Sequence, residues 1–190
     1  MKILGISGSL RRESYNSALL RAAREVAGGA AELEIWDGLK AVPPYDDDDD
    51  GNEAPAAVTE LRAAIAGADA VLIATPEYNS SVPGQLKNAL DWASRPLRTN
   101  PLRNKPVAVV GASTGVFGAV WAQAELRKIV AAIGARPLES GLPVSRAPSR
   151  FDDDGQLVDG SVRDRLAEIL DELAAAVEER AAATLHQEAA

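Results

Sequence analysis

The sequence has no cysteine, a single histidine and few aromatic residues. Without cysteine, disulfide bonds, thiolate nucleophiles, cysteine-ligated zinc and iron–sulfur clusters are excluded. The histidine, His186, lies near the C-terminal end of the sequence, where we expect neither a catalytic nor a metal-binding role. A transition-metal site would then need carboxylate ligands alone, so no metal is predicted. Because aromatic residues make up only 4% of the chain, the core must be built from Ala, Val, Leu and Ile.

Long hydrophobic runs are also missing. The sequence begins MKILGISGSL, in which Gly and Ser interrupt the apolar residues from position 5, so it does not resemble a signal peptide. No later run approaches the roughly 18 apolar residues of a membrane span. The formal net charge of −8 gives an acidic surface that repels phosphate backbones. We therefore expect a cytoplasmic protein that binds neither nucleic acid nor a membrane.

Positive charge is concentrated in two places. Arg11 and Arg12 lie in an early loop. The second basic group, near the middle of the chain, consists of Arg95, Arg98, Arg103 and Lys105. In an acidic protein such residues can hold the anionic groups of a ligand, although for the second group solvated surface is an equally open interpretation.

The acidic run Asp46–Asp50 lacks the ligand spacing of a calcium loop and is expected to be a solvated loop.

Short apolar segments alternate with longer segments of helical periodicity along the whole chain. Nearly continuous apolar runs such as 106–112 are typical of strands that are covered on both faces. The alternation predicts a parallel sheet with helices on both faces, in one domain over residues 1–183 with a frayed tail over 184–190. Ser161 is expected to cap the last helix. The expected strands are 2–7, 32–36, 68–75, 106–112 and 136–142, and the expected helices are 16–28, 54–66, 83–95, 118–133 and 161–183.

In an open parallel sheet, ligands bind outside the carboxyl ends of the strands, so function is expected in the loops after the first, third and fourth strands. The first loop, GSLRRESYNS over residues 8–17, matches neither the dinucleotide motif G-x-G-x-x-G nor the P-loop. Its hydroxyls, an amide and Arg11 precede a helix N-terminus, which suits a single terminal phosphate. The alternative is that Ser14 or Asn16 only caps the helix and that the arginines are solvated.

The loop after the third strand reads TPEYNSSVPGQLKNALDW from Thr75. Pro83 fits the first turn of a helix, where its missing N–H costs nothing. Pro76 stiffens a segment whose backbone amides and Tyr78 ring could lie along the edge of a flat heteroaromatic ligand. The alternative for Tyr78 is an ordinary surface aromatic, and Trp92 is expected in the core.

Together, the segments GSLRRESYN and PEYNSSVPGQLKNALDW resemble the NADPH-dependent FMN reductase family, which includes bacterial quinone, chromate and azo-dye reductases. The resemblance spans roughly residues 1–135. It implies a flavodoxin-like three-layer α/β sandwich with five parallel strands in the order 2-1-3-4-5, bound FMN, and a homodimer or homotetramer. The cofactor-binding residues that it implies are Ser9, Arg11, Ser14, Tyr15, Asn16 and Ser17 for the phosphate, Pro76, Glu77, Tyr78 and Asn79 for the isoalloxazine ring, and Ser113, Thr114 and Gly115 after the fourth strand.

The function that the resemblance implies is an NAD(P)H-dependent FMN or quinone reductase, with NADPH or NADH as co-substrate. Hydride would pass from the nicotinamide to N5 of FMN. A small acceptor such as a quinone, free flavin, a nitro or azo compound or chromate would then take the electrons in a ping-pong cycle. Because the cofactor carries this chemistry, no catalytic side chain is required, in agreement with the missing cysteine and the lone histidine in the tail.

Two other functions remain open at this point. A flavodoxin-type carrier would hold FMN without oxidising a nicotinamide, but flavodoxins usually bind phosphate with loops that lack arginine, so Arg11 argues against it. A receiver-like signalling domain would need an acidic residue at the end of the third strand, where this sequence has Thr75.

The turn after the fourth strand differs from the family that the sequence resembles. Val116 and Phe117 are bulkier than the glycines often found there in that family.

Overall fold

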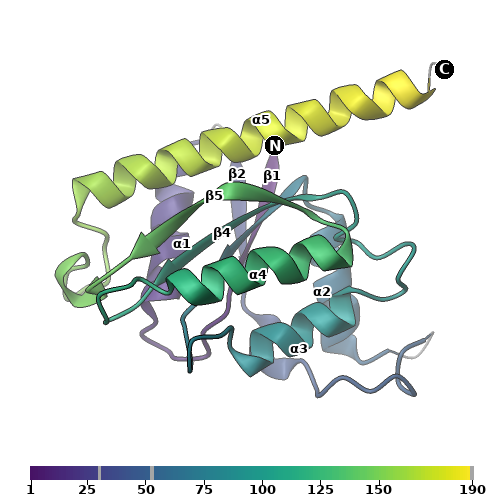
Figure 1. The fold of residues 1–190 in the computed structure, drawn as a ribbon, viewed down its shortest axis with the longest axis horizontal. Helices are drawn as coiled ribbons and strands as arrows, with labels where there is room; N and C mark the ends of the chain where they lie inside the picture. Colours follow the sequence, from purple (N-terminus) through teal and green to yellow (C-terminus); the bar gives the residue numbers. More distant parts are fainter. Residues whose placement is uncertain (30, 52–53, 189–190) are drawn as a thin grey trace.

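The computed structural model describes residues 1–29, 31–51 and 54–188 of the chain. Five parallel strands form one sheet in the order β2-β1-β3-β4-β5 (Figure 1). This order, with helices on both faces, confirms the predicted flavodoxin-like three-layer architecture. The strands are β1 (Lys2–Ser7), β2 (Glu32–Trp36), β3 (Ala70–Ala74), β4 (Pro106–Ala112) and β5 (Arg136–Val144), and the α-helices are α1 (Tyr15–Ala27), α2 (Ala56–Ala66), α3 (Gly84–Ala93), α4 (Val120–Ile133) and α5 (Gly160–Glu188).

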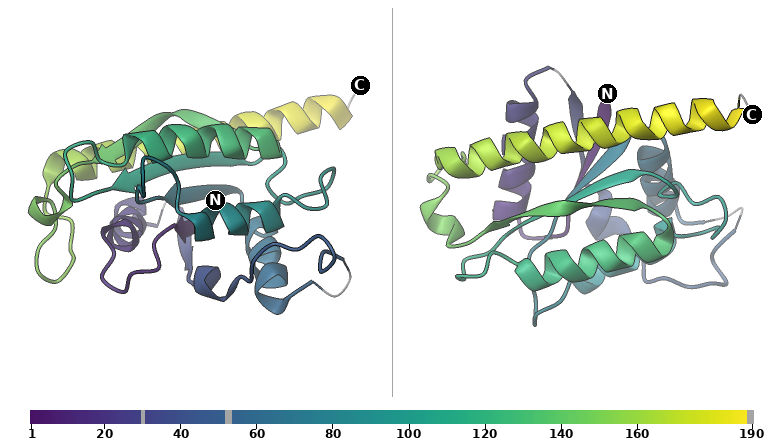
Figure 2. Two further views of the ribbon diagram at one scale, coloured as in Figure 1. Left: turned by 60° about the horizontal axis from the view of Figure 1, so that its bottom comes forward. Right: turned by 45° about the horizontal axis from the view of Figure 1, so that its top comes forward.

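Aliphatic side chains fill both interfaces between the sheet and its helices. Every residue of β3 and β4 is buried, because both faces of these central strands are covered, and this explains their continuously apolar sequences. Helices α2, α3 and α4 cover one face, where Leu61, Leu86 and Leu126 belong to one buried cluster. Helices α1 and α5 cover the other face through residues such as Leu19 and Leu166 (Figure 2). Burying one such side chain stabilises the fold by about 1.5–3 kcal/mol, so the two layers hold the strand ends firmly.

The last helix differs from its prediction at both ends. Asp159, and not Ser161, caps α5, because its Oδ1 atom accepts hydrogen bonds from the Ser161 hydroxyl at 2.6 Å and from the Val162 N–H at 3.0 Å. The bond from Ser161, the bond from Val162 and the nearby Arg150 lower the pKa of the Asp159 carboxyl to about 2. A carboxylate at a helix N-terminus also interacts favourably with the helix dipole, which explains why it takes the capping position.

Helix α5 continues past residue 183 to Glu188. Fraying of the tail stays a prediction, and residues 189–190 lie outside the described part of the chain. Within the described ranges, no helix is both long enough and apolar enough to cross a membrane. Because all five strands are parallel, their carboxyl ends meet at one edge of the sheet, and the loops after the neighbouring strands β1, β3 and β4 emerge side by side there.

Candidate functional site

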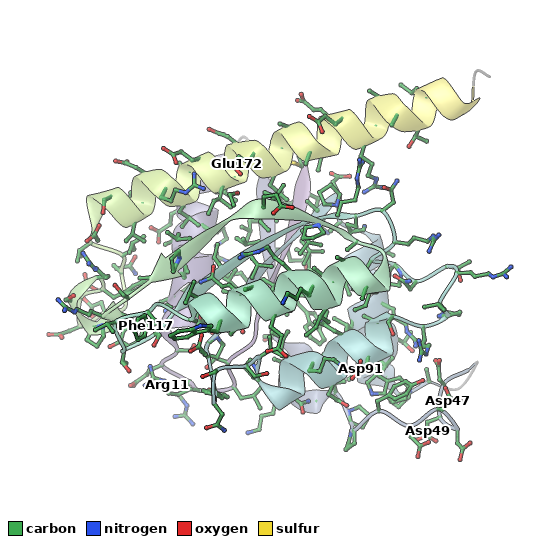
Figure 3. All side chains as sticks on the ribbon, viewed as in Figure 1. Arg11, Asp47, Asp49, Asp91, Phe117 and Glu172 are labelled. Atoms are coloured by element: carbon green, nitrogen blue, oxygen red, sulfur yellow. The ribbon has the colours of Figure 1, made fainter. Side chains whose placement is uncertain are left out.

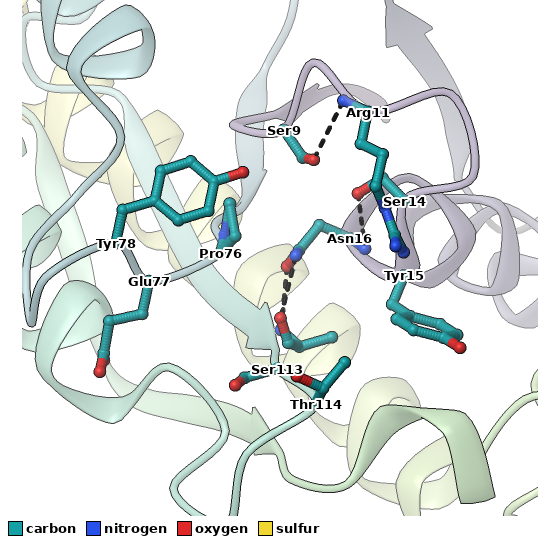
Figure 4. Close-up of a pocket in the computed structure, with 11 residues that line it drawn as sticks. Ser9, Arg11, Ser14, Tyr15, Asn16, Pro76, Glu77, Tyr78, Ser113 and Thr114 are labelled. Atoms are coloured by element: carbon teal, nitrogen blue, oxygen red, sulfur yellow. Dashed lines mark hydrogen bonds between the residues drawn. The ribbon is translucent and has the colours of Figure 1, made fainter.

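A pocket of about 220 Å³ lies where the loops after β1, β3 and β4 meet (Figure 4). It brings together three segments that are far apart in the sequence, as expected for loops at one edge of a parallel sheet. Most of the sequence-predicted cofactor residues line it. The lining residues are Ser9, Arg11, Ser14, Tyr15, Asn16, Pro76, Glu77, Tyr78, Ala112, Ser113 and Thr114.

The chain passes from β1 into α1 through residues 8–14. Gly8 lets this segment pack closely, because a Cβ atom at that position would lie 2.8 Å from the Leu86 side chain and 3.5 Å from a backbone carbonyl oxygen of β3. Ser14 is the N-cap of α1, and its hydroxyl accepts a hydrogen bond from the Asn16 N–H at 3.2 Å. The capping role that the sequence left open for Ser14 is therefore confirmed.

The first turn of α1 keeps donors for an anion even though it is capped. In the part of the chain that the structure describes, the N–H groups of Tyr15 and Ser17 have no hydrogen-bond acceptor. The Arg11 guanidinium lies over the Tyr15 ring, with its Cζ atom 5.3 Å from the ring centroid. Free N–H groups at a helix N-terminus, beside a guanidinium, form a site that favours negative charge. This end of the pocket can therefore hold a phosphate.

Asn16 links two of the pocket loops. Its side chain is only 3% exposed, and its Nδ2 atom donates to the Ala112 carbonyl at 3.0 Å while its Oδ1 atom accepts from the Ala112 N–H at 2.9 Å. Ala112 ends β4, 96 residues further along the chain. The paired bonds hold the start of α1 against the end of β4. Contact between Asn16 and a cofactor stays a prediction.

The loop after β3 ends in a tight turn. The backbone groups of Tyr78 and Ser81 exchange two hydrogen bonds, at 3.0 and 3.1 Å, and Asn79 and Ser80 between them have positive φ angles of 54° and 61°. Asn79 is thereby placed at the corner of the turn, outside the pocket lining. The Tyr78 side chain is 53% exposed and stands beside the pocket, whereas Pro76 is buried at its base (Figure 4).

The Glu77 carboxylate caps helix α4. Its Oε2 atom accepts hydrogen bonds from the backbone N–H groups of Trp121 at 3.0 Å and Ala122 at 3.1 Å. Helix α4 has no cap of its own, because its N-cap residue is Ala119, which has a left-handed backbone with φ 61° and no side-chain acceptor. Glu77 therefore fixes the loop after β3 to the first turn of α4, which follows the loop after β4.

Replacing Glu77 with alanine should lower the free energy of unfolding by about 1 kcal/mol, the usual cost of losing a helix N-cap. Glutamine at the same position should recover most of this loss, because its side-chain carbonyl also accepts hydrogen bonds. Urea unfolding of the cofactor-free proteins measures both effects. If Glu77→Ala unfolded at the wild-type urea concentration, the carboxylate would not cap α4 in solution.

The loop after β4 is held by the segment that follows β5. The Ser113 hydroxyl accepts from the Gly115 N–H at 3.0 Å, and the Ser113 carbonyl accepts from the Ala147 N–H at 3.0 Å. The Gly115 carbonyl accepts from the Arg146 N–H at 2.8 Å. These bonds leave Ser113 and Thr114 in the pocket lining and Gly115 outside it.

The remaining differences between the predicted cofactor residues and the pocket lining concern Ser17 and Ala112. The Ser17 hydroxyl donates to the Ser7 hydroxyl at 2.9 Å, and Ser17 does not line the pocket. Ala112 lines the pocket although the sequence did not predict it, because alanine carries no functional group. The one available signal for Ala112 was its position at the end of the fourth strand, directly before a loop that was predicted to bind the cofactor. Whether each lining residue contacts a cofactor stays a prediction.

The basic residues near the middle of the chain do not line the pocket. Lys105 is 4% exposed, and its ammonium donates to the carbonyls of Ile65, at 2.7 Å, in the last turn of helix α2, and of Ala68, just beyond that helix. Burial, reinforced by a nearby arginine, lowers its pKa to about 8. The Arg95 Nε atom donates to the Tyr45 hydroxyl at 3.2 Å. Because Arg95 follows α3, roughly 15 Å of helix separates it from the pocket loops.

The acidic run 46–50 also lies away from the pocket. Figure 3 shows Asp47 toward one end of the molecule and Arg11 toward the other. The first four carboxylates are exposed, as predicted, whereas Asp50 is half-buried in an ion pair with Arg62 at 2.8 Å. Among the described residues, no group of three or more His, Cys, Asp and Glu side chains is placed to hold a metal ion.

Comparison with known proteins gives matches over most of the chain. Residues 1–148 match the family model described as NADPH-dependent FMN reductase. The chain is 42% identical over 174 residues to an NAD(P)H-dependent FMN reductase from Pseudomonas aeruginosa, covering 91% of this chain and 93% of the relative. It is 37% identical over 181 residues to a 2-hydroxy-1,4-benzoquinone reductase from a Burkholderia species, covering 95% and 98%.

Solved structures give the same result. The flavoenzyme FerB, an NAD(P)H:(acceptor) oxidoreductase from Paracoccus denitrificans, superposes with a TM-score of 0.83 at 34% identity, over 94% of this chain and 98% of that one. A flavodoxin from Pseudomonas aeruginosa superposes with a TM-score of 0.56 at 16% identity, which supports the shared fold alone.

Proposed function

The chain belongs to the NADPH-dependent FMN reductase family, and on that premise we propose that it binds FMN in the pocket and uses NADPH or NADH to reduce small acceptors, quinones above all. The proposal rests on the convergence of three strand-end loops on one pocket, with free amides and a guanidinium at one end and the exposed Tyr78 beside the other. A planar cofactor with one terminal phosphate matches this arrangement, because it has an anionic group at one end and a flat aromatic ring at the other.

The residues present fit FMN. The N–H groups of Tyr15 and Ser17, the Ser9 hydroxyl and the Arg11 guanidinium supply donors for the three oxygens of a monophosphate. Each charge-assisted hydrogen bond of this kind contributes about 1.5–3 kcal/mol. For the ring, the backbone N–H groups of Glu77 and Thr114 have no acceptor among the described residues and can donate, and the carbonyls of these loops can accept, without any titrating side chain.

The chemistry that FMN supplies when bound is acceptance of a hydride at N5 from a nicotinamide and delivery of the electrons to a second acceptor, in a ping-pong cycle. The chain itself binds and orients. Arg11 and the start of α1 hold the phosphate, and the bonds of Asn16 and Glu77 fix the three loops relative to one another. The lining side chains need not exchange a proton in this cycle, which suits a pocket without histidine or cysteine.

Purification and a coupled assay test the function. The protein should bind FMN, turn yellow, and oxidise NADPH or NADH when a quinone is added, whereas the FMN-free protein should be inactive. Bound FMN without oxidation of either nicotinamide would favour the flavodoxin-type carrier. A colourless protein that does not take up added FMN would contradict the proposal.

Replacing Arg11 with alanine should weaken FMN binding by about tenfold or more, because a charge-assisted contact to the phosphate is lost. Titration of the cofactor-free protein with FMN measures the change. Arg98→Ala is the matched control, because Arg98 is also exposed but lies in the loop beyond α3. Unchanged affinity in Arg11→Ala would remove Arg11 from the phosphate site.

We further propose that the protein acts in the cytoplasm as a homodimer or homotetramer. Support for association comes from the start of α4, beside the pocket loops. Phe117 and Trp121 are 58% and 47% exposed there, and their ring centroids lie 4.7 Å apart in an edge-to-face arrangement. Adjacent exposed aromatic side chains of this kind are typical of protein interfaces.

A further inference from the structure

The pocket carries charges of opposite sign on its two sides. Of the described residues that line it, Arg11 and Glu77 are the two with a charged side chain. Figure 4 shows Arg11 beside the start of α1 and Glu77 beside Tyr78, on the other side of the pocket. The charge of Arg11 suits a phosphate. The charge of Glu77 is not explained by its capping of α4, because a neutral amide or hydroxyl oxygen also accepts hydrogen bonds from backbone N–H groups.

The negative charge of Glu77 is held in place and is not paired. Its Oε2 atom accepts from the N–H groups of Trp121 and Ala122, at 3.0 and 3.1 Å, so the half-buried side chain cannot turn into solvent without losing both bonds. Among the described residues, no cation forms an ion pair with it. The N-terminus of α4 offsets about half an elementary charge. A net negative charge therefore remains on this side of the pocket.

The length of the Glu77 side chain limits how far this charge can lie from the ring of bound FMN. The Glu77 N–H has no acceptor among the described residues and can donate to the ring. A glutamate carboxylate lies at most about 6 Å from its own backbone nitrogen, and a hydrogen bond adds about 3 Å. The carboxylate then lies within about 9 Å of the ring, a distance over which partly buried charges are only partly screened.

Hydride transfer changes the charge of the ring. A hydride consists of one proton and two electrons, so the ring that accepts it gains one negative charge, and the nicotinamide that gives it up gains one positive charge and leaves. A fixed carboxylate opposes the charge that the ring gains. Two unit charges about 9 Å apart repel enough to shift an equilibrium about twofold in water, and about twentyfold at the effective dielectric constant of about 20 found near protein surfaces.

We propose that the carboxylate of Glu77 lowers the reduction potential of bound FMN and thereby makes the reduced flavin a stronger electron donor. The inference rests on the proposed function, because it concerns FMN in this pocket. Glu77 acts through the flavin, without exchanging a proton or touching the reacting atoms. Its charge weakens the drive for hydride uptake and strengthens the drive for electron transfer to the acceptor. Acceptors that are weak oxidants, such as quinones of low potential, gain most from it.

Two variants separate the charge of Glu77 from its cap. Glu77→Gln removes the charge and keeps an oxygen that accepts from α4, whereas Glu77→Ala removes both. Each cofactor-free protein is titrated with oxidised FMN and, without oxygen, with reduced FMN at mildly alkaline pH, where the reduced ring is ionised. The ratio of the two dissociation constants gives the potential of bound FMN relative to free FMN, even for a variant that binds both forms weakly.

We expect the ratio of the Kd for reduced FMN to the Kd for oxidised FMN to fall by about twofold to twentyfold in both variants. For a two-electron couple this corresponds to a rise in potential of about 10–40 mV. Oxidation of the reduced Glu77→Gln protein by a quinone should slow as well. A purely capping role of Glu77 predicts instead that Glu77→Gln keeps the wild-type ratio.

Glu179→Gln is the matched control for the loss of one negative charge. Glu179 is exposed, lies outside the pocket lining, and stands about 30 Å along α5 from the helix end at the pocket edge of the sheet (Figure 1). Because that distance exceeds the screening length in physiological salt, the ratio should stay at the wild-type value.

An unchanged ratio in Glu77→Gln, or an equal fall in Glu179→Gln, would overturn the inference. If FMN stays bound and NADPH or NADH still reduces a quinone in that case, the proposed function stands. A wild-type protein that takes up no FMN would refute both the proposed function and the role of Glu77.

Discussion

Replacing Asn16 with leucine should lower the free energy of unfolding by about 2–6 kcal/mol and weaken FMN binding as well. Leucine has a similar volume, but it can neither donate to the Ala112 carbonyl nor accept from the Ala112 N–H. Both backbone groups would then be buried without partners, at about 1–3 kcal/mol each. The start of α1 would also lose its fixed distance from β4, so the phosphate donors would no longer be held in place. Urea unfolding and FMN titration measure the two effects.

Asn88→Leu provides the control for Asn16→Leu. Asn88 makes the same kind of link, because its Nδ2 atom donates to the Pro43 carbonyl at 2.8 Å and its Oδ1 atom accepts from the Tyr45 N–H at 2.7 Å. It lies on α3 and outside the pocket lining. We expect Asn88→Leu to reduce stability while FMN affinity stays at the wild-type value. If Asn16→Leu kept full FMN affinity, the link to Ala112 would not shape the pocket.

Gly118→Ala should destabilise the fold by about 3 kcal/mol or more. Gly118 has a φ angle of 61°, which costs a residue with a side chain about 1–2 kcal/mol. A Cβ atom there would also lie 2.5 Å from the Pro143 carbonyl carbon and 2.8 Å from the Val144 nitrogen. These are backbone atoms of β5, which cannot move away as a flexible side chain could. The Ser113 N–H donates to the Val144 carbonyl at 3.0 Å, so a shift of β5 would also disturb the pocket loop that follows β4.

The matched control is Gly84→Ala, at the start of α3, where an added Cβ atom meets nothing within 4 Å. That change should be neutral or stabilising by up to about 1 kcal/mol, because alanine is the better helix former. Thermal unfolding of both variants gives the comparison. Equal melting temperatures for the two alanine variants would contradict the contact of Gly118 with β5.

Strands β1, β2 and β4 have the predicted bounds, although only β4 of these three is buried along its whole length. A strand covered on both faces needs an unbroken apolar run, and this run is visible in the sequence of β4. Strand β3 is shorter than its apolar run at both ends. Beyond these ends, the Asp69 carboxylate accepts a hydrogen bond from the Lys2 N–H at 2.7 Å, and the Thr75 hydroxyl donates to the Pro76 carbonyl at 2.8 Å. Such side-chain bonds to the backbone leave no periodic signal in a sequence.

The position of the site was predictable for a related reason. Loops that follow neighbouring parallel strands must meet at one edge, so their motifs indicated a shared pocket before any contact was known. The bonds that Asn16 and Glu77 make could not be predicted, because their partners lie 96 and 44 residues further along the chain. The same limit applies to Lys105, which looked like a surface cation and is instead buried against the end of α2.

The pocket is lined by segments that are far apart in the sequence, and this determines when it can form during translation. Residues 9–16 are synthesised before the wall they face, which ends at Thr114. Until that wall has left the ribosome, the phosphate loop has nothing opposite it. A ligand of this pocket can therefore stabilise only a chain that already includes Thr114, and a scarcity of that ligand would affect the lifetime of the folded protein.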